Sequence, residues 1–438
     1  MPRAGQPLTR PTVRAVRKCR NSLPVYTARP QEPYFSSCPI TSWREPTSIS
    51  RLGIDLGLQK MWSWQRSWLG GTLFASLMFL SSFFGAIYIL TPMLPLMLIR
   101  PKWYRAVVDQ LIAWWETFPV ALLELVYGVR VRITGDTIRG GERTLIIMNH
   151  RSRLDWMFLW SCLLRRGQLS KEKIILKTSL KNIPGPGWAM QVGCFLFIKR
   201  RWDEDEKIIK RMLNYLTSIR HETQLLLFPE GTDLTEYTRK RSNDYAKEYN
   251  LPKYNYVLHP RTTGFVYIVE KLRRAKQLDC IHDITVGYPA GVLQNEMDLF
   301  AGRFPREVHF HIRRHPLRTL PNTTGQLELW CTTRWAEKEL QLKEFYQRKR
   351  FRDLNLVDGR KTGNHLRKEQ VKAILWLSIL FWGNFIVLML YLMVNYLFFL
   401  KITAIVAVFY LVEGVMFGGV EDMEIKLHNA IWAKLPWK

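Results

Sequence analysis

Residues 144–156 read TLIIMNHRSRLDW, and this stretch determines how the rest of the chain is interpreted. Its first five residues are mostly apolar and β-branched, a pattern that predicts a short buried strand. A new apolar run opens at Asp155, so Asp155 is predicted to begin a helix, where a carboxylate also stabilises the positive end of the helix dipole. The stretch therefore predicts a strand, a turn and a helix in direct succession.

The turn carries His150, five residues before Asp155. That spacing corresponds to about 140° around a continuous helix, so only a strand-to-helix turn brings the two side chains together. A carboxylate that orients a histidine ring creates a general base. Two structural alternatives stand beside this interpretation, because short motifs also arise by chance. Asp155 is then an ordinary N-cap, and His150 is a hydrogen-bonded loop residue.

The chain around this stretch alternates between strand and helix patterns. Short apolar runs predict strands at residues 173–176, 194–198, 224–228, 284–286 and 308–312. Proline and glycine residues predict a loop at 183–187, and periodic apolar residues predict a helix at 203–220. Such alternation predicts an α/β fold with a largely parallel sheet, in which ligands bind at the carboxyl ends of the strands. Polar residues follow three of the strands: His150; Lys199 and Arg200; and Glu230, Gly231 and Thr232. This regularity favours a catalytic site over unrelated loops.

Long apolar segments flank the central region on both sides. Within residues 61–100, residues 72–91 carry no charge and are long enough to cross a bilayer. Residues 103–126 predict an interfacial helix on the membrane, with a core helix as the alternative. A charged helix and linker (326–372) then precede two apolar spans within residues 373–420, predicted to form a transmembrane hairpin divided at Lys401. That hairpin returns the tail, 421–438, to the side of the central domain.

The formal net charge of +27 indicates anionic partners. The apolar spans and the aromatic content favour membrane lipids over nucleic acid. Six scattered cysteines indicate neither a zinc site nor a disulfide framework. Residues 1–60 are rich in Pro, Ser and Arg and predict a disordered basic tail. The Arg-bearing start of this tail has features of a mitochondrial transit peptide. Its prolines, however, would break the amphipathic helix that such a peptide needs.

Three blocks of sequence resemble the glycerolipid acyltransferase family. They are the His-x4-Asp block from His150 to Asp155, the block from Gly193 to Arg200, and FPEGT at residues 228–232. VGYP at residues 286–289 lies where the family has an apolar strand that ends in proline. The resemblance covers roughly residues 61–426, and stretches such as HPRTTGF are similar to the lysocardiolipin-acylating branch. It implies an acyltransferase domain at residues 101–325.

The resemblance also implies the chemistry. Acyl-CoA is the expected co-substrate, a lysophospholipid the expected acceptor, and no bound cofactor is expected. His150 is expected to be the base, oriented by Asp155, with direct transfer of the acyl group; no G-x-S-x-G elbow suggests a covalent intermediate. Lys199 and Arg200 are expected to hold the acceptor's phosphate, and three further residues to bind the acceptor: Glu230, Gly231 and Thr232.

One position departs from the family pattern. Many members have arginine where this chain has Asp233, so the cation at this position is absent, and Arg239 or Arg241 is the proposed substitute. The expected location is the endoplasmic reticulum membrane with the site facing the cytosol, and a mitochondrial membrane is the alternative.

Other interpretations of the sequence remain open at this stage. His309 and His311 alternate on a predicted strand and share a face, but without a nearby pair of carboxylates they are weak evidence for a metal site. The same His-Asp pair would also serve a CoA-independent transacylase. A basic membrane scaffold without catalysis is the alternative from another class of protein, although it leaves the polar strand ends unexplained.

Overall fold

The computed structural model describes residues 64–166, 169–292, 294–352 and 366–432. In this part of the chain a seven-stranded sheet has the order β1-β7-β6-β2-β5-β3-β4. Its strands are β1 (Arg130–Gly135), β2 (Thr144–Met148), β3 (Glu172–Lys177), β4 (Leu196–Ile198), β5 (Gln224–Leu227), β6 (Cys280–Gly287) and β7 (Glu307–Pro316). Neighbouring strands are parallel except β6 and β7, which are antiparallel. The predicted α/β fold with a largely parallel sheet is confirmed.

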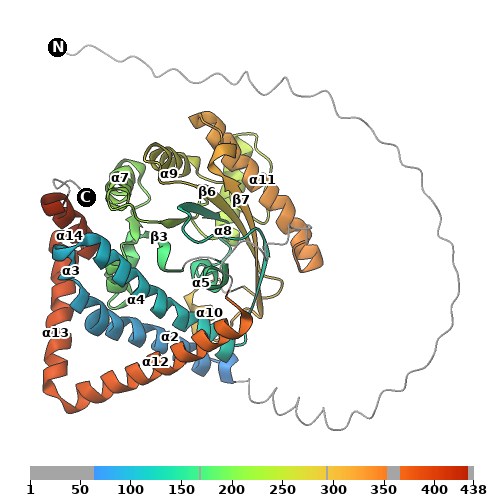
Figure 1. Ribbon diagram of the computed structural model, residues 1–438. Helices are drawn as coiled ribbons and strands as arrows, with labels where there is room; N and C mark the ends of the chain where they lie inside the picture. Colours follow the sequence, from blue (N-terminus) through green and yellow to red (C-terminus); the bar gives the residue numbers. More distant parts are fainter. Residues whose placement is uncertain (1–63, 167–168, 293, 353–365, 433–438) are drawn as a thin grey trace, which may run out of the picture. The chain divides into compact units, whose positions relative to one another are not determined.

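Helices cover both faces of the sheet (Figure 1). One face packs against α7 (Trp202–Ser218), α9 (Thr262–Arg274) and α11 (Thr324–Arg348). The other packs against α4 (Pro101–Ala121) and α5 (Asp155–Arg166), with α2 (Trp68–Phe84) and α12 (Lys368–Asn395) adjoining them. Because side chains of a strand alternate between faces, Leu145 and Ile147 enter the first core, and Ile146 and Met148 enter the second. Strand β2 is thus buried on both sides.

The remaining helices are short or lie at the rim. They are α3 (Leu96–Ile99), α6 (Pro186–Val192), α8 (Glu236–Glu248), α10 (Glu296–Phe300), α13 (Leu397–Val412) and α14 (Val420–Leu427). Several predicted boundaries move, and two of the changes have a clear cause in the backbone. The strand predicted at 194–198 begins only at Leu196, because Cys194 has a φ of 58°, which no strand residue adopts. The predicted loop at 183–187 ends earlier, because Pro186 already begins α6.

Among the described residues, four helical segments are long and apolar enough to cross a membrane. They are Trp68–Ile99, Pro101–Val126, Lys368–Asn395 and Leu397–Phe417. The second is the segment predicted as an interfacial helix, and 61% of its most apolar part is buried against the rest of the protein. Residues 1–60, predicted as a disordered tail, lie outside the described residues, as does most of the predicted linker.

The division of the C-terminal apolar region at Lys401 is wrong. Tyr396 adopts an extended conformation (φ −132°, ψ 108°) and separates α12 from α13, whereas Lys401 lies inside α13. The two helices diverge from this corner (Figure 1). Beyond α13, helix α14 packs against α6 and α7 through contacts such as Asp422 with Arg211 at 2.6 Å, so the chain returns to the central domain as expected.

Candidate active site

His150 and Asp155 meet at the carboxyl end of strand β2. The strand ends at Met148, the chain turns through residues 149–154, and α5 begins at Asp155. His150 Nδ1 lies 3.0 Å from Asp155 Oδ2. The predicted pairing of these two side chains across a strand-to-helix turn is therefore present.

Asp155 is completely buried and is surrounded by donors. Its Oδ2 accepts hydrogen bonds from the backbone N–H groups of Arg151 (2.6 Å) and Ser152 (2.9 Å), and its Oδ1 accepts one from the hydroxyl of Tyr288. These three donors fix the orientation of the carboxylate group. Asp155 thus braces the turn from the first position of the helix and faces the imidazole at the same time, whereas an N-cap side chain would accept from N–H groups further along the helix.

The ring of His150 keeps one nitrogen available. Its face stacks on Phe228 with ring centroids 4.1 Å apart, and 16% of the side chain is exposed. Its Nδ1 is engaged by Asp155, and within the described ranges Nε2 has no protein partner. A neutral imidazole held by Asp155 at Nδ1 presents a proton acceptor at Nε2, which is the arrangement that general-base chemistry needs.

Glu230 is a buried structural anchor of this site. Its carboxylate accepts hydrogen bonds from the backbone N–H groups of His150 (3.3 Å) and Leu258 (3.1 Å) and from the indole of Trp335 on α11 (3.0 Å). Burial raises the pKa of Glu230 to about 8. Glu230 therefore connects its own loop to the backbone at His150, to the backbone at Leu258 and to helix α11. Because its oxygens face these protein donors, the geometry favours a positioning role over direct contact with an acceptor.

A cavity of ≈ 650 Å³ opens beside the loop that follows β5. Gly231 and Thr232 line it, as does Arg200, which follows β4. Gly231 has a φ of 72°, so glycine is needed there for its backbone conformation. Lys199, in contrast, is not among the residues that line this cavity, and its ammonium pairs with Glu204 at 2.7 Å. The structure thus brings four of the five predicted binding residues to one cavity and leaves Lys199 outside it.

The cavity has more positive than negative groups, because three arginines and two buried acids, Asp205 and Glu230, line it. Arg241 of α8 and Arg261, which precedes α9, line it together with Arg200, and in the described part of the chain none of these guanidiniums forms an ion pair. Partial burial and the charge of Arg261 lower the pKa of Arg200. Guanidiniums on separate elements that lack an ion-pair partner have the chemistry to bind an anion. Arg241, one of two residues proposed to replace the missing cation at position 233, lies here, whereas Arg239 is not among the lining residues.

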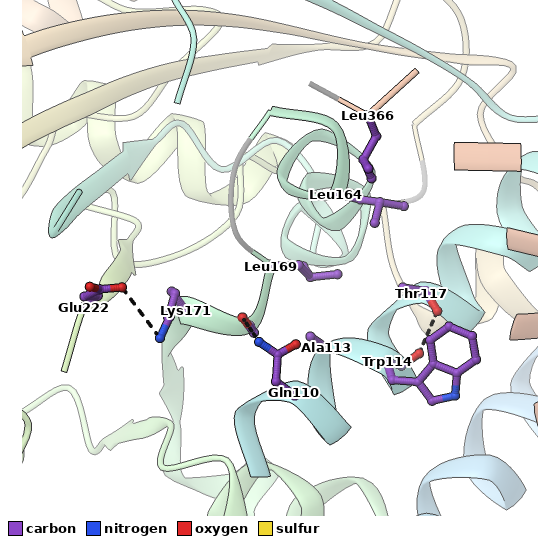
Figure 2. Close-up of a pocket in the computed structure, with 10 residues that line it drawn as sticks. Gln110, Ala113, Trp114, Thr117, Leu164, Leu169, Lys171, Glu222 and Leu366 are labelled. Carbon is purple, nitrogen blue, oxygen red and sulfur yellow. Dashed lines mark hydrogen bonds and ion pairs between the residues drawn. The ribbon is translucent and has the colours of Figure 1, made fainter. Parts of the chain in front are cut away.

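A second cavity, of ≈ 490 Å³, lies near the amino ends of strands β3 and β5, and Figure 2 shows its lining residues. Gln110, Ala113, Trp114 and Thr117 of α4 form one wall, and Lys171, just before β3, contacts Glu222 at 3.7 Å. Because Lys171 precedes its strand while His150 follows its own, a strand length of roughly 17 Å separates the two sites. This cavity is therefore not part of the His150 site.

Among the described residues, one group of three side chains has the composition of a metal site: Glu142, Cys280 and His282. Its environment opposes metal binding. Glu142 is already paired with Arg314, whose Nε lies 3.1 Å away. Burial and the charge of Glu142 raise the pKa of the Cys280 thiol to about 12. His309 and His311, the pair considered from the sequence, bond instead to Glu307 (3.0 Å) and Thr134 (3.0 Å).

Sequence reasoning missed two residues of the site. Tyr288 follows β6 directly, so the rule that ligand-binding residues follow strands could have identified it. Arg261 lies in HPRTTGF, a stretch noted only for its resemblance, and nothing in its local pattern indicates that it faces Arg200.

Comparisons with known proteins place these residues in context. Residues 130–288 match the family model Acyltransferase, and residues 298–382 match Acyltransferase C-terminus. Lysocardiolipin acyltransferase 1 of Gallus gallus is 48% identical over 369 residues, which cover 83% of this chain and 95% of that protein. Its namesake of Danio rerio is 55% identical over 277 residues, covering 63% and 71%. Lysophosphatidylinositol acyltransferase 10 of Caenorhabditis elegans is 41% identical over 280 residues, again covering 63% and 71%.

Among solved structures, the 1-acyl-sn-glycerophosphate acyltransferase PlsC of Thermotoga maritima is similar to this chain with a TM-score of 0.42 and 13% sequence identity. The match covers 63% of this chain and 96% of that protein.

Proposed function

The chain belongs to the acyltransferase family, and we propose that it transfers a fatty acyl group from acyl-CoA to a free hydroxyl of a lysophospholipid. The observation that carries this proposal is the buried Asp155 at 3.0 Å from Nδ1 of His150, with Nε2 left available. Relatives named as lysocardiolipin and lysophosphatidylinositol acyltransferases support an acceptor of this class.

In the proposed reaction, His150 is the general base. Its Nε2 takes the proton of the acceptor hydroxyl while the hydroxyl oxygen attacks the thioester carbon. A C–O bond forms, the C–S bond breaks, and the CoA thiolate leaves with the proton that His150 returns. A thioester is already activated and thiolate is a good leaving group, so deprotonation of the hydroxyl is the step that needs the base. Asp155 holds the ring and stabilises its charged form.

The cationic cavity beside this pair is the proposed site for the acceptor's phosphate. Arg200 and Arg261 lie close enough that one guanidinium depresses the pKa of the other, and a phosphate relieves that repulsion. Arg241 supplies a third positive charge in the same cavity. Phe228, on which His150 stacks, lines the same cavity together with Gly231 and Thr232.

The proposed setting is a membrane of the endoplasmic reticulum, with His150 on the cytosolic side, where acyl-CoA is available; a mitochondrial membrane is the alternative. Four helices long and apolar enough to cross a bilayer support membrane association. Lipid acceptors then reach the site from the bilayer. We propose no bound cofactor.

The test is an assay of the full-length protein, purified in detergent, with a panel of lysolipids that includes monolysocardiolipin and lysophosphatidylinositol. With acyl-CoA, acylated lipid and free CoA are expected to appear in equal amounts. Acylation that continues without CoA or acyl-CoA would identify a transacylase instead. Lipid binding without acylation of any acceptor, equal in wild type and His150→Ala, would support the scaffold alternative.

A further inference from the structure

Tyr288 lies directly against the His-Asp pair although it comes from another strand. It follows the last residue of β6, which runs parallel to β2 with Met148 opposite Ile284. Its side chain is 1% exposed, its ring packs edge-on against Phe158 of α5 (centroids 5.9 Å apart), and its hydroxyl donates a hydrogen bond to Asp155.

The ends of the two strands are fixed to each other. The side chain of Asn149 accepts a hydrogen bond from the backbone N–H of Val286 (2.8 Å) and donates one to the carbonyl of Val286 (3.1 Å). Asn149 precedes His150, and Val286 lies two residues before Tyr288. The hydroxyl and the carboxylate therefore belong to one rigid arrangement.

The two oxygens of Asp155 have separate partners. Oδ2 faces Nδ1 of His150 and the backbone N–H groups of Arg151 and Ser152, whereas Oδ1 has Tyr288. Asp155 is 0% exposed, so water has no direct access to Oδ1 if the phenol is removed. A buried oxygen without a donor is unfavourable, and the carboxylate would be free to rotate or to draw the imidazole proton away from its present geometry.

Burial and the charge of Asp155 raise the pKa of the Tyr288 phenol well above its usual value, so the phenol remains a donor throughout the neutral range. The phenol of Tyr288 therefore acts on Asp155 as a hydrogen-bond donor. It does not face the cavity that contains Arg200 and is not among the residues that line it.

We propose that Tyr288 is a positioning residue for acyl transfer, which holds Oδ1 of Asp155 so that Oδ2 keeps His150 aligned as the base. This inference rests on the proposed function, since it assigns Tyr288 to the same reaction. It predicts an effect on the chemical step, and no effect on the binding of acyl-CoA or acceptor.

The test is a double-mutant cycle in the full-length, detergent-purified protein. Tyr288→Phe keeps the ring and its contact with Phe158, and removes only the hydroxyl. The matched control is Tyr127→Phe, because Tyr127 is equally buried and its hydroxyl donates to the carbonyl of Gly70 (2.6 Å), away from the site. The cycle is completed by Asp155→Asn and by the double variant Tyr288→Phe/Asp155→Asn, assayed with radiolabelled acyl-CoA over long incubations.

Tyr288→Phe is expected to lower kcat roughly 10-fold, the effect of losing one hydrogen bond to an ionised group, with both KM values unchanged. In the Asp155→Asn background the same substitution is expected to change the rate less than about 2-fold, because coupled residues are not additive. A normal kcat for Tyr288→Phe overturns the inference. So does an equal loss in both backgrounds, or a matching loss in Tyr127→Phe, since either indicates general destabilisation.

The thermal midpoint of each variant is measured in parallel. If Tyr288→Phe does not fold, Phe158→Leu replaces it, because this substitution weakens the packing of the Tyr288 ring but keeps the hydroxyl. Phe158→Leu is expected to lower kcat only in the presence of Asp155. An equal loss of kcat in the Asp155→Asn background overturns the inference. An inactive wild type would contradict the proposed function itself, whereas an active wild type with a normal Tyr288→Phe contradicts only the role of Tyr288.

Discussion

At the scale of single residues, two features define the site. Buried carboxylates accept hydrogen bonds from protein donors, whereas the arginines of the cavity have no acidic partner in an ion pair among the described residues. Asp155 and Glu230 are both buried in donor-rich surroundings, yet Asp155 faces the histidine ring whereas Glu230 holds the backbone behind it. The spacing of His150 and Asp155 could be interpreted from the sequence because a strand-to-helix turn was recognisable. The role of Glu230 could not, because its partner Trp335 comes from α11, over 100 residues later.

The arginine cavity gives a prediction on substrate binding. Arg261→Ala is expected to raise the acceptor's KM roughly 10-fold and to leave the KM of acyl-CoA unchanged, because one charge-assisted contact to phosphate is lost. Arg200→Ala should behave alike, and Arg200→Lys should recover only part of the loss, since an ammonium cannot bind phosphate bidentately. Arg239→Ala, outside the cavity, is the control. Equal changes in both KM values would assign the arginines to another role.

Glu172 gives a prediction on pH. Burial raises its pKa to about 8, and its Oε2 accepts a hydrogen bond from the indole of Trp160 (2.7 Å). Because the folded pKa exceeds the unfolded value of about 4.3, the folded state binds more protons between these values. Stability is thus highest at low pH in this window and falls as the pH rises towards 8.

Glu172→Gln removes this titration and is expected to reduce the loss of thermal stability between pH 5 and pH 8.5. Unfolding is followed in detergent at both pH values, and Glu248→Gln, at an exposed position, is the control. An unchanged pH dependence in Glu172→Gln would show that Glu172 does not titrate in this window.

At the scale of elements, apolar runs predicted the strands well because they are buried on both faces. Strands β2, β3, β6 and β7 contain the predicted apolar runs, and β5 contains all of its predicted run except the last residue, Phe228. Strand β1 was missed, because Arg130 and Arg132 alternate with its apolar residues on an edge of the sheet and interrupt the run. The boundary at Lys401 was wrong because a charge interrupts an apolar pattern without ending a helix; the backbone turns at Tyr396.

The packing of helix α14 predicts how much a buried ion pair contributes to the stability of the protein. Its Glu424 is buried and contacts Arg105 of α4 at 2.9 Å, and it also accepts a hydrogen bond from Tyr215 of α7. Glu424→Ala leaves the buried Arg105 without this partner and is expected to cost about 3–5 kcal/mol. Asp422→Ala, two residues earlier, breaks a more exposed pair with Arg211 and is expected to cost less than about 1 kcal/mol.

The two variants of α14 are compared by thermal unfolding and by limited proteolysis of the C-terminal segment. Glu424→Ala should lower the midpoint and expose α14 to cleavage, whereas Asp422→Ala should do neither. Equal behaviour of the two variants would mean that buried charge does not hold α14 in place.

At the scale of the whole molecule, the central domain and its flanking apolar helices were predictable, but their packing was not. Length and hydropathy predicted the apolar segments, with α4 as an interfacial helix, whereas only the structure shows that α4 buries Arg105 and Asp109 against the central domain. A helix with both an apolar surface and buried charges gives an ambiguous pattern in sequence. The interfacial position of this helix stays a prediction.

Topology gives a prediction on the whole chain. Asn322 is exposed and begins the sequon Asn322-Thr323-Thr324. No candidate span lies between His150 and Asn322 in the described residues, so both are expected on the same side of the membrane. If that side is the cytosol, Asn322 stays unmodified, and treatment of membrane-derived protein with an endoglycosidase leaves its mobility unchanged. A shift that Asn322→Gln abolishes would place the site in the lumen.

The central claim is that His150, held by Asp155, is the base for acyl transfer from acyl-CoA. The most direct measurement is the initial rate of acylated lysophospholipid and CoA formation by purified wild type and His150→Ala, with thermal midpoints measured in parallel. The account predicts equal amounts of both products from wild type and a rate about 10² to 10⁴ lower for a folded His150→Ala. A folded His150→Ala that acylates at a near-normal rate would contradict it.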